Sequence, residues 1–216
     1  MKYYVANWKA NKNLDEAKAW LIELSSLINV HPVADKIIIC PPTPYIIPLS
    51  KMAGELKIEL AAQNLSQYPS GSYTGETTAK QLKGHVKYAL IGHNERRIYF
   101  HENEEILFEK FIQAKMAGIE PIYCIRSVAD RIPEEAKIVA YEPVEAIGSG
   151  QNEDPKKVID VKNSLALENK KVIFLYGGSV TKDNAEAYIQ TGRIDGFLVG
   201  SESLTAINFF KIMSLV

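Results

Sequence analysis

The sequence predicts an α/β fold, a closed (β/α)8 barrel of eight parallel strands. Short apolar runs alternate with amphipathic stretches along the whole 216-residue chain. Most of the runs are apolar throughout, which is typical of parallel strands that are buried on both faces. The eight expected strands are Tyr3–Ala6, Lys36–Cys40, Lys57–Ala62, Val86–Gly92, Ile119–Ile125, Lys137–Tyr141, Lys171–Tyr176 and Ile194–Val199.

The amphipathic stretches predict helices between these strands. Asn13 has the position of an N-cap, and Glu16 is placed to complete a capping box for a helix that carries apolar residues from Leu14 to Ile28. The other expected helices are Glu104–Ala117 before Gly118, a helix opened by Asp154 and Pro155, a helix capped by Thr181 that runs to Thr191 and is ended by Gly192, and Leu204–Leu215.

The connection between the fifth and sixth expected strands is short. It has the 11 residues Arg126–Ala136, and Pro133 interrupts it. Because a crossover that contains a helix needs at least roughly 10–12 residues, we expect this helix to be shortened or missing. Outer helices do not hold reacting groups, so we expect a loss of stability there rather than of catalysis.

An open doubly wound sheet is the alternative architecture, but no GxGxxG turn follows the first expected strand, which weakens it. The chain contains no linker, fixed-period repeat or low-complexity segment. We therefore expect residues 1–216 to form a single barrel domain.

Composition narrows the class of protein. The net charge is −1 and no basic block stands out, so nucleic acid is not expected as a partner. No apolar run approaches the length that crosses a membrane, and the N-terminal residues lack the apolar segment of a signal peptide. Cys40 and Cys124 lie far apart in apolar runs, which indicates reduced, buried thiols in a cytoplasmic protein.

Candidate functional residues gather where the expected strands end, which is where barrels of this kind place their active sites. Asn7 and Lys9 follow the first strand, His93 follows the fourth and Glu142 follows the sixth. Each has an ordinary structural explanation when taken alone, but those explanations do not predict all four at the same end of successive strands. The loop from Pro143 to Gly150 suggests a lid over Glu142 acting as a base.

Two glycine-containing turns follow the last two strands, namely Gly177-Gly178-Ser179 and Gly200-Ser201. Glycine lets backbone N–H groups approach an anion, so these turns suit a phosphate group. A carboxylate, an imidazole and a lysine around a phosphoester suit proton abstraction next to a carbonyl. No His, Cys and carboxylate cluster has metal-ligand spacing, so we expect neither a metal nor another cofactor.

Several strings of the sequence together resemble the triosephosphate isomerase family. They occur in the family's order and extend from one end of the chain to the other. The strings are Ala6–Lys9, Ala62–Asn64, Gly71–Glu76, Ile91–Arg97, Tyr141–Gly150, Tyr176–Val180 and Asp195–Gly200.

The resemblance implies a TIM barrel that interconverts dihydroxyacetone phosphate and glyceraldehyde 3-phosphate through an enediolate. Triosephosphate isomerase is itself a standard example of a glutamate base beside a neutral histidine. By this resemblance Glu142 is the base, His93 is the neutral electrophile, Lys9 supplies positive charge, Asn7 positions the substrate and Glu95 supports the site.

The resemblance also implies how the phosphate is bound and covered. Asn7, Lys9 and the backbone of Gly148, Ser179, Gly200 and Ser201 would hold the phosphate. Ile147 and Leu198 would close over Glu142, and exclusion of water would make its carboxylate a stronger base. The implied lid consists of Pro143, Val144, Glu145, Ala146, Ile147, Gly148, Ser149 and Gly150.

A homodimer is implied as well. The polar segment Gln67–Glu76 would insert into a second subunit, so that Thr74 approaches Asn7 of the partner subunit and Glu76 pairs with Arg96. By itself this segment is also compatible with a flexible surface loop.

The chain departs from the family's pattern in several places. Glu145 stands where the lid usually has a tryptophan, and Arg126 and Ser127 stand where a glycine and a glutamate are usual. Ser201 replaces a glycine and Asn94 replaces a serine. We hypothesise that Glu145 pairs with Arg126, which would make lid kinetics sensitive to salt.

Two other functions remain open from the sequence. One is a non-catalytic barrel that binds phosphate, against which the joint presence of Asn7, Lys9, His93 and Glu142 argues. The other is a barrel enzyme that acts on a larger phosphorylated substrate.

Overall fold

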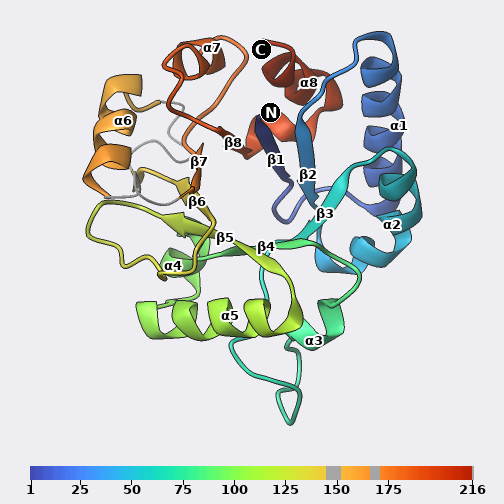
Figure 1. Ribbon diagram of the computed structural model, residues 1–216. Helices are drawn as coiled ribbons and strands as arrows, with labels where there is room; N and C mark the ends of the chain where they lie inside the picture. The colour runs from blue at the N-terminus through green and yellow to red at the C-terminus, as the bar shows by residue number, and fades with distance from the viewer. Residues whose placement is uncertain (145–151, 166–170, 216) are drawn as a thin grey trace.

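The computed structural model describes residues 1–144, 152–165 and 171–215. Eight parallel strands form a closed barrel in which each strand pairs with the next along the chain and β8 pairs with β1 (Figure 1). This confirms the expected fold class. The strands are β1 (Tyr3–Asn7), β2 (Lys36–Cys40), β3 (Glu59–Ala62), β4 (Tyr88–Ile91), β5 (Glu120–Ile125), β6 (Ile138–Tyr141), β7 (Ile173–Tyr176) and β8 (Gly196–Val199).

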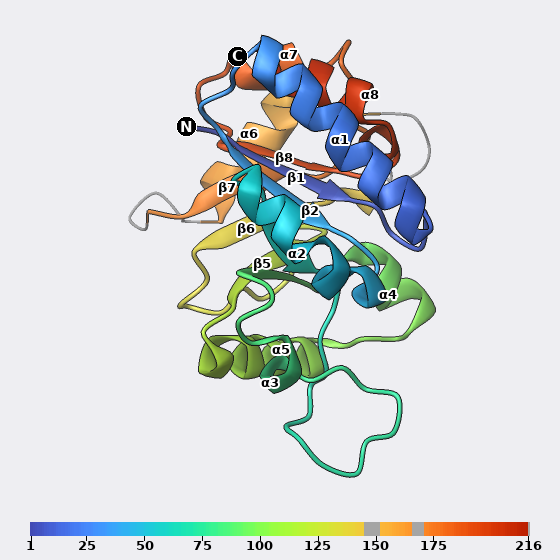
Figure 2. The same ribbon diagram turned by 90° about the vertical axis from the view of Figure 1, so that its right-hand side faces the viewer.

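Helices surround the barrel (Figures 1 and 2). Short 3-10 turns at Thr43–Tyr45 and Ser201–Leu204 precede α2 and α8. The helices are α1 (Leu14–Val30), α2 (Ile46–Glu55), α3 (Ala79–Leu82), α4 (Asn94–Tyr99), α5 (Glu104–Ala117), α6 (Pro155–Ser164), α7 (Ala185–Ile189) and α8 (Ala206–Met213). None of those in the described residues is long and apolar enough to cross a membrane.

Most expected helix starts agree with the structure. Asn13 and Glu16 form the reciprocal capping box of α1, and Asp154 caps α6 through the N–H of Lys156. The helix expected from Thr181 begins later, at Ala185. Here the Asn184 side chain binds Thr181 N–H and the carbonyl of Ser179, which holds a turn before α7.

Three helices were not expected from the sequence. α3 and α4 have four and six residues, too short for a periodic apolar pattern to be visible. α2 follows a proline-rich stretch, and Pro48 lies in its first turn, where a missing N–H breaks no helical hydrogen bond. The final helix is shorter than expected, because a separate 3-10 turn takes up Leu204 before α8.

No helix forms between β5 and β6, all of whose connecting residues the structure describes. This confirms the prediction of a missing helix. Ala136 and Pro133 are buried, and Ile132 packs against the apolar layer between the barrel and its helices. A segment of turns and bends therefore covers the part of the barrel wall where a helix is usual.

Two apolar layers make up the core. One lies between the strands and the helices. The other fills the barrel interior, where alternate residues of the strands point inward. The interior side chains are Val5, Ile38, Cys40, Ala61, Leu90, Ile122, Cys124, Ile138, Ala140, Leu175 and Leu198.

Candidate active site

Strand pleating decides which residues face the mouth of the barrel. Side chains two positions apart on a strand point the same way. Val5, Ala140, Leu175 and Leu198 all belong to the barrel interior. The residues two positions further along are Asn7, Glu142, Gly177 and Gly200, and all four line one pocket at the strands' C-terminal ends. The pattern therefore brings a carboxylate, an amide and two positions without side chains into one cavity.

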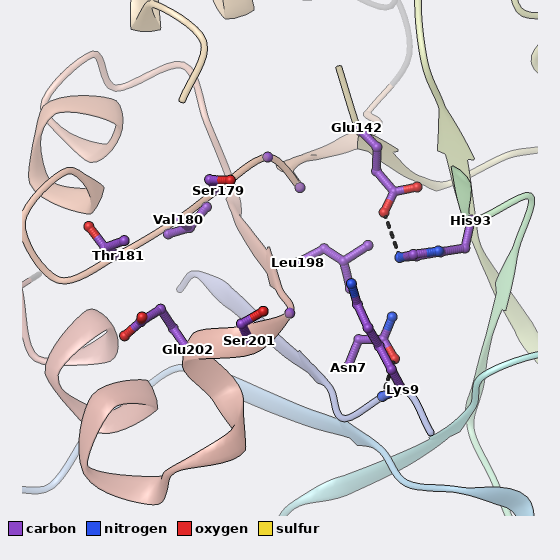
Figure 3. Close-up of a pocket in the computed structure, with 13 residues that line it drawn as sticks. Asn7, Lys9, His93, Glu142, Ser179, Val180, Thr181, Leu198, Ser201 and Glu202 are labelled. Carbon is purple, nitrogen blue, oxygen red and sulfur yellow. Dashed lines mark hydrogen bonds and ion pairs between the residues drawn. The ribbon is translucent and has the colours of Figure 1, made fainter. Parts of the chain in front are cut away.

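One side of this pocket, formed by Lys9, His93 and Glu142 and called here the side-chain half, carries the ionisable groups. Figure 3 shows Glu142 and His93 facing each other, with Ser179 and Thr181 across the pocket. Glu142 Oε1 lies 3.0 Å from His93 Nε2, and Glu142 Oε2 accepts a hydrogen bond of 2.9 Å from the backbone N–H of Asn94. Only 1% of Glu142 is exposed, so both oxygens lie in a largely water-free environment.

The protonation of His93 follows from its two neighbours. Its Nδ1 accepts a hydrogen bond of 3.2 Å from the N–H of Glu95, so in the neutral ring the proton belongs on Nε2, which then donates to Glu142. Burial lowers the pKa of His93, but the Glu142 carboxylate, its hydrogen bond to the ring and the nearby Glu95 together raise it by more, so the net pKa is raised from its ordinary value. The N–H of Glu95 donates to Nδ1 and so opposes protonation of that nitrogen. Loss of the contact with Glu142 would therefore favour the neutral ring.

Lys9 is held in an unusual backbone conformation. Its φ is 53°, in the left-handed region that few non-glycine residues adopt. Gln63 Nε2 donates to the Lys9 carbonyl at 2.8 Å, and Asn7 Oδ1 accepts the Lys9 N–H at 3.1 Å. The Lys9 ammonium lies 2.6 Å from Glu95 Oε1. Polar contacts from three strand ends thus fix where the charge of Lys9 lies.

The opposite side of the pocket, called here the main-chain half, consists of Gly177–Thr181 and Gly200–Glu202. A Cβ at Gly177 would lie 3.0 Å from Glu142 Cγ, and one at Gly200 would lie 3.3 Å from Lys9 Cε. A Cβ at Gly178 would meet the Tyr176 hydroxyl oxygen at 2.2 Å. Glycine at these positions leaves a cavity of about 280 Å³ bordered by backbone.

The structure brings together most of the site residues expected from the sequence. One pocket is lined by Asn7, Lys9, His93, Glu142, Ser179, Gly200 and Ser201. Glu95 lies outside it, facing a neighbouring pocket that shares Asn7, Lys9 and His93. Leu198, expected to close over Glu142, also lines the first pocket.

The implied lid is described only at its start. Pro143 is buried and Val144 is 52% exposed. The positions Glu145, Ala146, Ile147, Gly148, Ser149 and Gly150 lie outside the described residues, and so does the hypothesised pairing of Glu145 with Arg126. Within the described residues, Arg126 contacts Asp130.

The residues expected at a subunit interface are accessible or paired within the chain. Thr74 and Glu76 are exposed on the segment between β3 and α3, which projects from the molecule (Figure 2). Arg96 Nε lies 2.5 Å from Glu102 Oε1.

Sequence reasoning missed the backbone N–H of Asn94 as a partner of Glu142. Every residue except proline has such a donor, so no side chain marks it in advance. It also missed Thr181 and Glu202 as pocket residues, because their places depend on turns that follow the glycines. Among the described residues, no group of three or more His, Cys, Asp or Glu side chains could hold a metal ion.

The family model described as triosephosphate isomerase matches residues 2–216. The chain belongs to the triosephosphate isomerase family. A triosephosphate isomerase from Buchnera aphidicola subsp. Schizaphis graminum is 35% identical over 246 residues, covering 99% of this chain and 97% of the relative. One from Blochmanniella floridana is 37% identical and covers 98% and 94%.

Solved structures of triosephosphate isomerases agree with this. The crystal structure of the enzyme from Bartonella henselae matches with a TM-score of 0.85 and 26% identity, covering 99% of this chain and 98% of that one. A barrel of this kind ordinarily has a helix after every strand. The helix-less connection between β5 and β6 is therefore one place where this triosephosphate isomerase family member is short.

Proposed function

We propose that Glu142 and His93 carry the proton transfers of the triosephosphate isomerase reaction in this pocket. The chain is an isomerase of this family. The reaction interconverts dihydroxyacetone phosphate and D-glyceraldehyde 3-phosphate through an enediolate, a step of glycolysis and gluconeogenesis. The observation that carries the assignment is the 3.0 Å contact between a buried carboxylate and a histidine whose Nδ1 already accepts a backbone hydrogen bond.

In this proposal the Glu142 carboxylate removes a proton from the carbon next to the substrate carbonyl. His93 Nε2–H donates a hydrogen bond to the carbonyl oxygen, on which negative charge develops. The Lys9 ammonium stabilises that charge, and Asn7 fixes the substrate's position. Glu142 then returns the proton to the carbon that carried the carbonyl, while the proton of the substrate hydroxyl moves to the former carbonyl oxygen by way of His93 Nε2, which completes the isomerisation.

The substrate has to replace the contact between Glu142 and His93. Both groups need to face the substrate, whereas without it they bind each other. Separation also removes the carboxylate that raises the pKa of His93, which favours the neutral ring needed for an electrophile. We infer that Glu142 leaves the N–H of Asn94 as the substrate enters.

The main-chain half is the proposed phosphate site. The backbone of Ser179, Gly200 and Ser201, with Gly148 from the lid, would donate to the phosphate oxygens, and Lys9 would contribute positive charge. The cavity of about 280 Å³ is slightly smaller than the roughly 300–1,000 Å³ of ordinary ligand pockets, which favours a three-carbon phosphoester over a larger substrate. Glu95 supports the site by pairing with Lys9 at 2.6 Å.

A homodimer is proposed as the working assembly. The projecting segment 67–76 would dock beside Asn7 of the partner subunit, at a second pocket that Gln63, Arg96 and Phe100 also line. Tyr99 and Phe100 at the end of α4 are 72% and 62% exposed, an apolar surface suited to a partner. Sedimentation at increasing concentration tests this, and a species that stays at the 24.1 kDa monomer mass would reject the dimer.

We also propose a single-domain, cytoplasmic enzyme. Cys40 and Cys124 are both free and fully buried, which suits a reducing compartment.

A coupled assay with glyceraldehyde 3-phosphate tests the function. We expect wild-type turnover well above background and a large fall in kcat for Glu142→Asp, which moves the carboxylate away from the reacting carbon. The exposed Glu135, changed to Asp, is the matched control and should keep wild-type kcat. Absence of wild-type turnover would instead support a non-catalytic phosphate-binding barrel.

A further inference from the structure

The connection between β5 and β6 holds a buried carboxylate that the proposed reaction does not use. Asp130 lies five residues after β5, and its side chain is only 9% exposed. Its Oδ2 accepts a hydrogen bond of 2.7 Å from the backbone N–H of Arg126, and its Oδ1 lies 3.5 Å from Arg126 Nη2. The side chain thus folds back onto the end of β5.

Asp130 also pairs with a more deeply buried cation. Arg97 Nη2 lies 3.6 Å from Asp130 Oδ2, and the Arg97 side chain is 4% exposed. Among the described residues, Asp130 is the one carboxylate within 4.0 Å of Arg97. A buried guanidinium needs such a partner, because its charge has left water.

Arg97 in turn joins the ends of two strands. Its Nε donates to the carbonyl of Gly92 at 2.9 Å, and its Nη2 donates to the carbonyl of Cys124 at 2.9 Å. Gly92 directly precedes His93. Ile125, next to Cys124, accepts the backbone N–H of Glu142 at 2.7 Å. The guanidinium therefore lies between the backbone that carries His93 and the backbone that carries Glu142.

We propose that Asp130 is a positioning residue, which holds Arg97 so that the ends of β4 and β5 keep His93 and Glu142 at their working separation. The proposal rests on the function proposed above and adds a residue that acts through Arg97 without touching the substrate. The connection between β5 and β6, which lacks a helix, would then also help to position the catalytic side chains, besides covering the barrel wall.

Kinetics of Asp130→Asn test the proposal, since the amide keeps the shape and removes the charge. We expect kcat to fall by about 10- to 100-fold, because small displacements of catalytic groups have effects of this size. KM should stay within about twofold, because the phosphate lies against the main-chain half, which Arg97 does not hold. A role in stability alone would lower the melting temperature and leave kcat unchanged, and that result would overturn the proposal.

Two further variants sharpen the test. On an Arg97→Gln background, Asp130→Asn should lower kcat no further, because its effect passes through the arginine; additive losses would contradict this. Glu135→Gln removes an exposed carboxylate from the same connection and should keep wild-type kcat. If Asp130→Asn does not fold, Asp130→Glu replaces it, with kcat expected to fall by about threefold or more and wild-type kcat counting against the proposal.

An NMR measurement separates this inference from the proposed function. The imidazole resonances of His93, assigned by their loss in His93→Gln, should move in Asp130→Asn and stay in place in Glu135→Gln. This readout does not need turnover. A wild type without isomerase activity would reject the proposed function, whereas unmoved His93 resonances would reject the role of Asp130.

Discussion

The two halves of the pocket are built by different means. The side-chain half depends on Lys9, His93 and Glu142, which are positioned by ion pairs and by hydrogen bonds from other strand ends. The main-chain half depends on the absence of side chains, because glycines occupy the inward-facing positions 177 and 200.

This difference matches the chemistry proposed for each half. Groups that exchange protons must be side chains with suitable pKa values, whereas an anion that does not react can be held by backbone dipoles. Substitutions in the side-chain half should therefore change kcat, and substitutions in the main-chain half should change KM.

The largest effect is expected from His93→Gln. The amide cannot provide the imidazole's donor at the same place, so kcat should fall by about 10²–10³-fold, as for removal of one oxyanion donor. KM should change little. The coupled assay measures both, and His85→Gln, at an exposed histidine, is the control that should behave as wild type. A rise in KM as large as the fall in kcat would contradict the expectation that substitutions in the side-chain half act on kcat alone.

Gly178→Ala should affect the other half. The new Cβ would lie 2.2 Å from the Tyr176 hydroxyl, so the turn has to move. Overpacking costs about 1–3 kcal/mol, and we expect KM to rise about tenfold as part of this reaches phosphate binding. Gly54→Ala is a matched control with no atom within 4 Å of the new Cβ. A large fall in kcat with constant KM would contradict the division.

The pH dependence of stability tests the contact inside the side-chain half. Burial lowers the pKa of His93, whereas Glu142 and, to a smaller extent, Glu95 raise it, with the net result that the folded-state pKa is raised from its ordinary value. Stability from a raised pKa is fully present below the unfolded value and is lost as pH rises through the folded value. The difference in melting temperature between wild type and Glu142→Gln should therefore be larger near pH 6 than near pH 8.5. A constant difference would mean that His93 stays neutral throughout.

The smallest effect is expected from Ser201→Gly. Ser201 is exposed, and the substitution keeps the backbone N–H that would face the phosphate. Exposed substitutions usually stay within about 0.5 kcal/mol, so KM should change by about twofold or less. Titration with inorganic phosphate provides the same comparison without turnover. A much weaker affinity would show that the hydroxyl itself takes part.

The apolar runs predicted the strands well but extended six of them too far towards the N-terminus; β5 and β6 begin one residue later than expected. β3, β4, β7 and β8 each begin two residues later than expected. Ile58, Val86 and Ile194 lie in the excess and are buried at 3%, 7% and 1% exposure. An apolar run indicates burial, whereas a barrel strand also requires backbone pairing with the neighbouring strands, which these residues lack; Val86 forms only an isolated bridge with Lys83.

The site residues show the same limit, because local sequence patterns do not reveal contacts made in the folded chain. The sequence identified Glu142, His93 and Lys9 as groups at strand ends, because a polar residue directly after a buried run is visible in the pattern. It did not identify Asp130 or Arg97, whose charges are indistinguishable in the sequence from solvated ones. Their burial depends on a connection folding back over β5.

Local sequence patterns were therefore enough to predict the number of strands, their parallel arrangement, a shortened or missing helix between the fifth and sixth strands, and which chemical groups stand at the mouth of the barrel. These features follow from local patterns of apolar residues, connection lengths and motifs. The 3.0 Å contact between Glu142 and His93, and the place of Arg97 between their strand ends, could be known only from the folded barrel. Such distances depend on the closure of all eight strands into one ring, because the register of each strand pair shifts the position of every strand end.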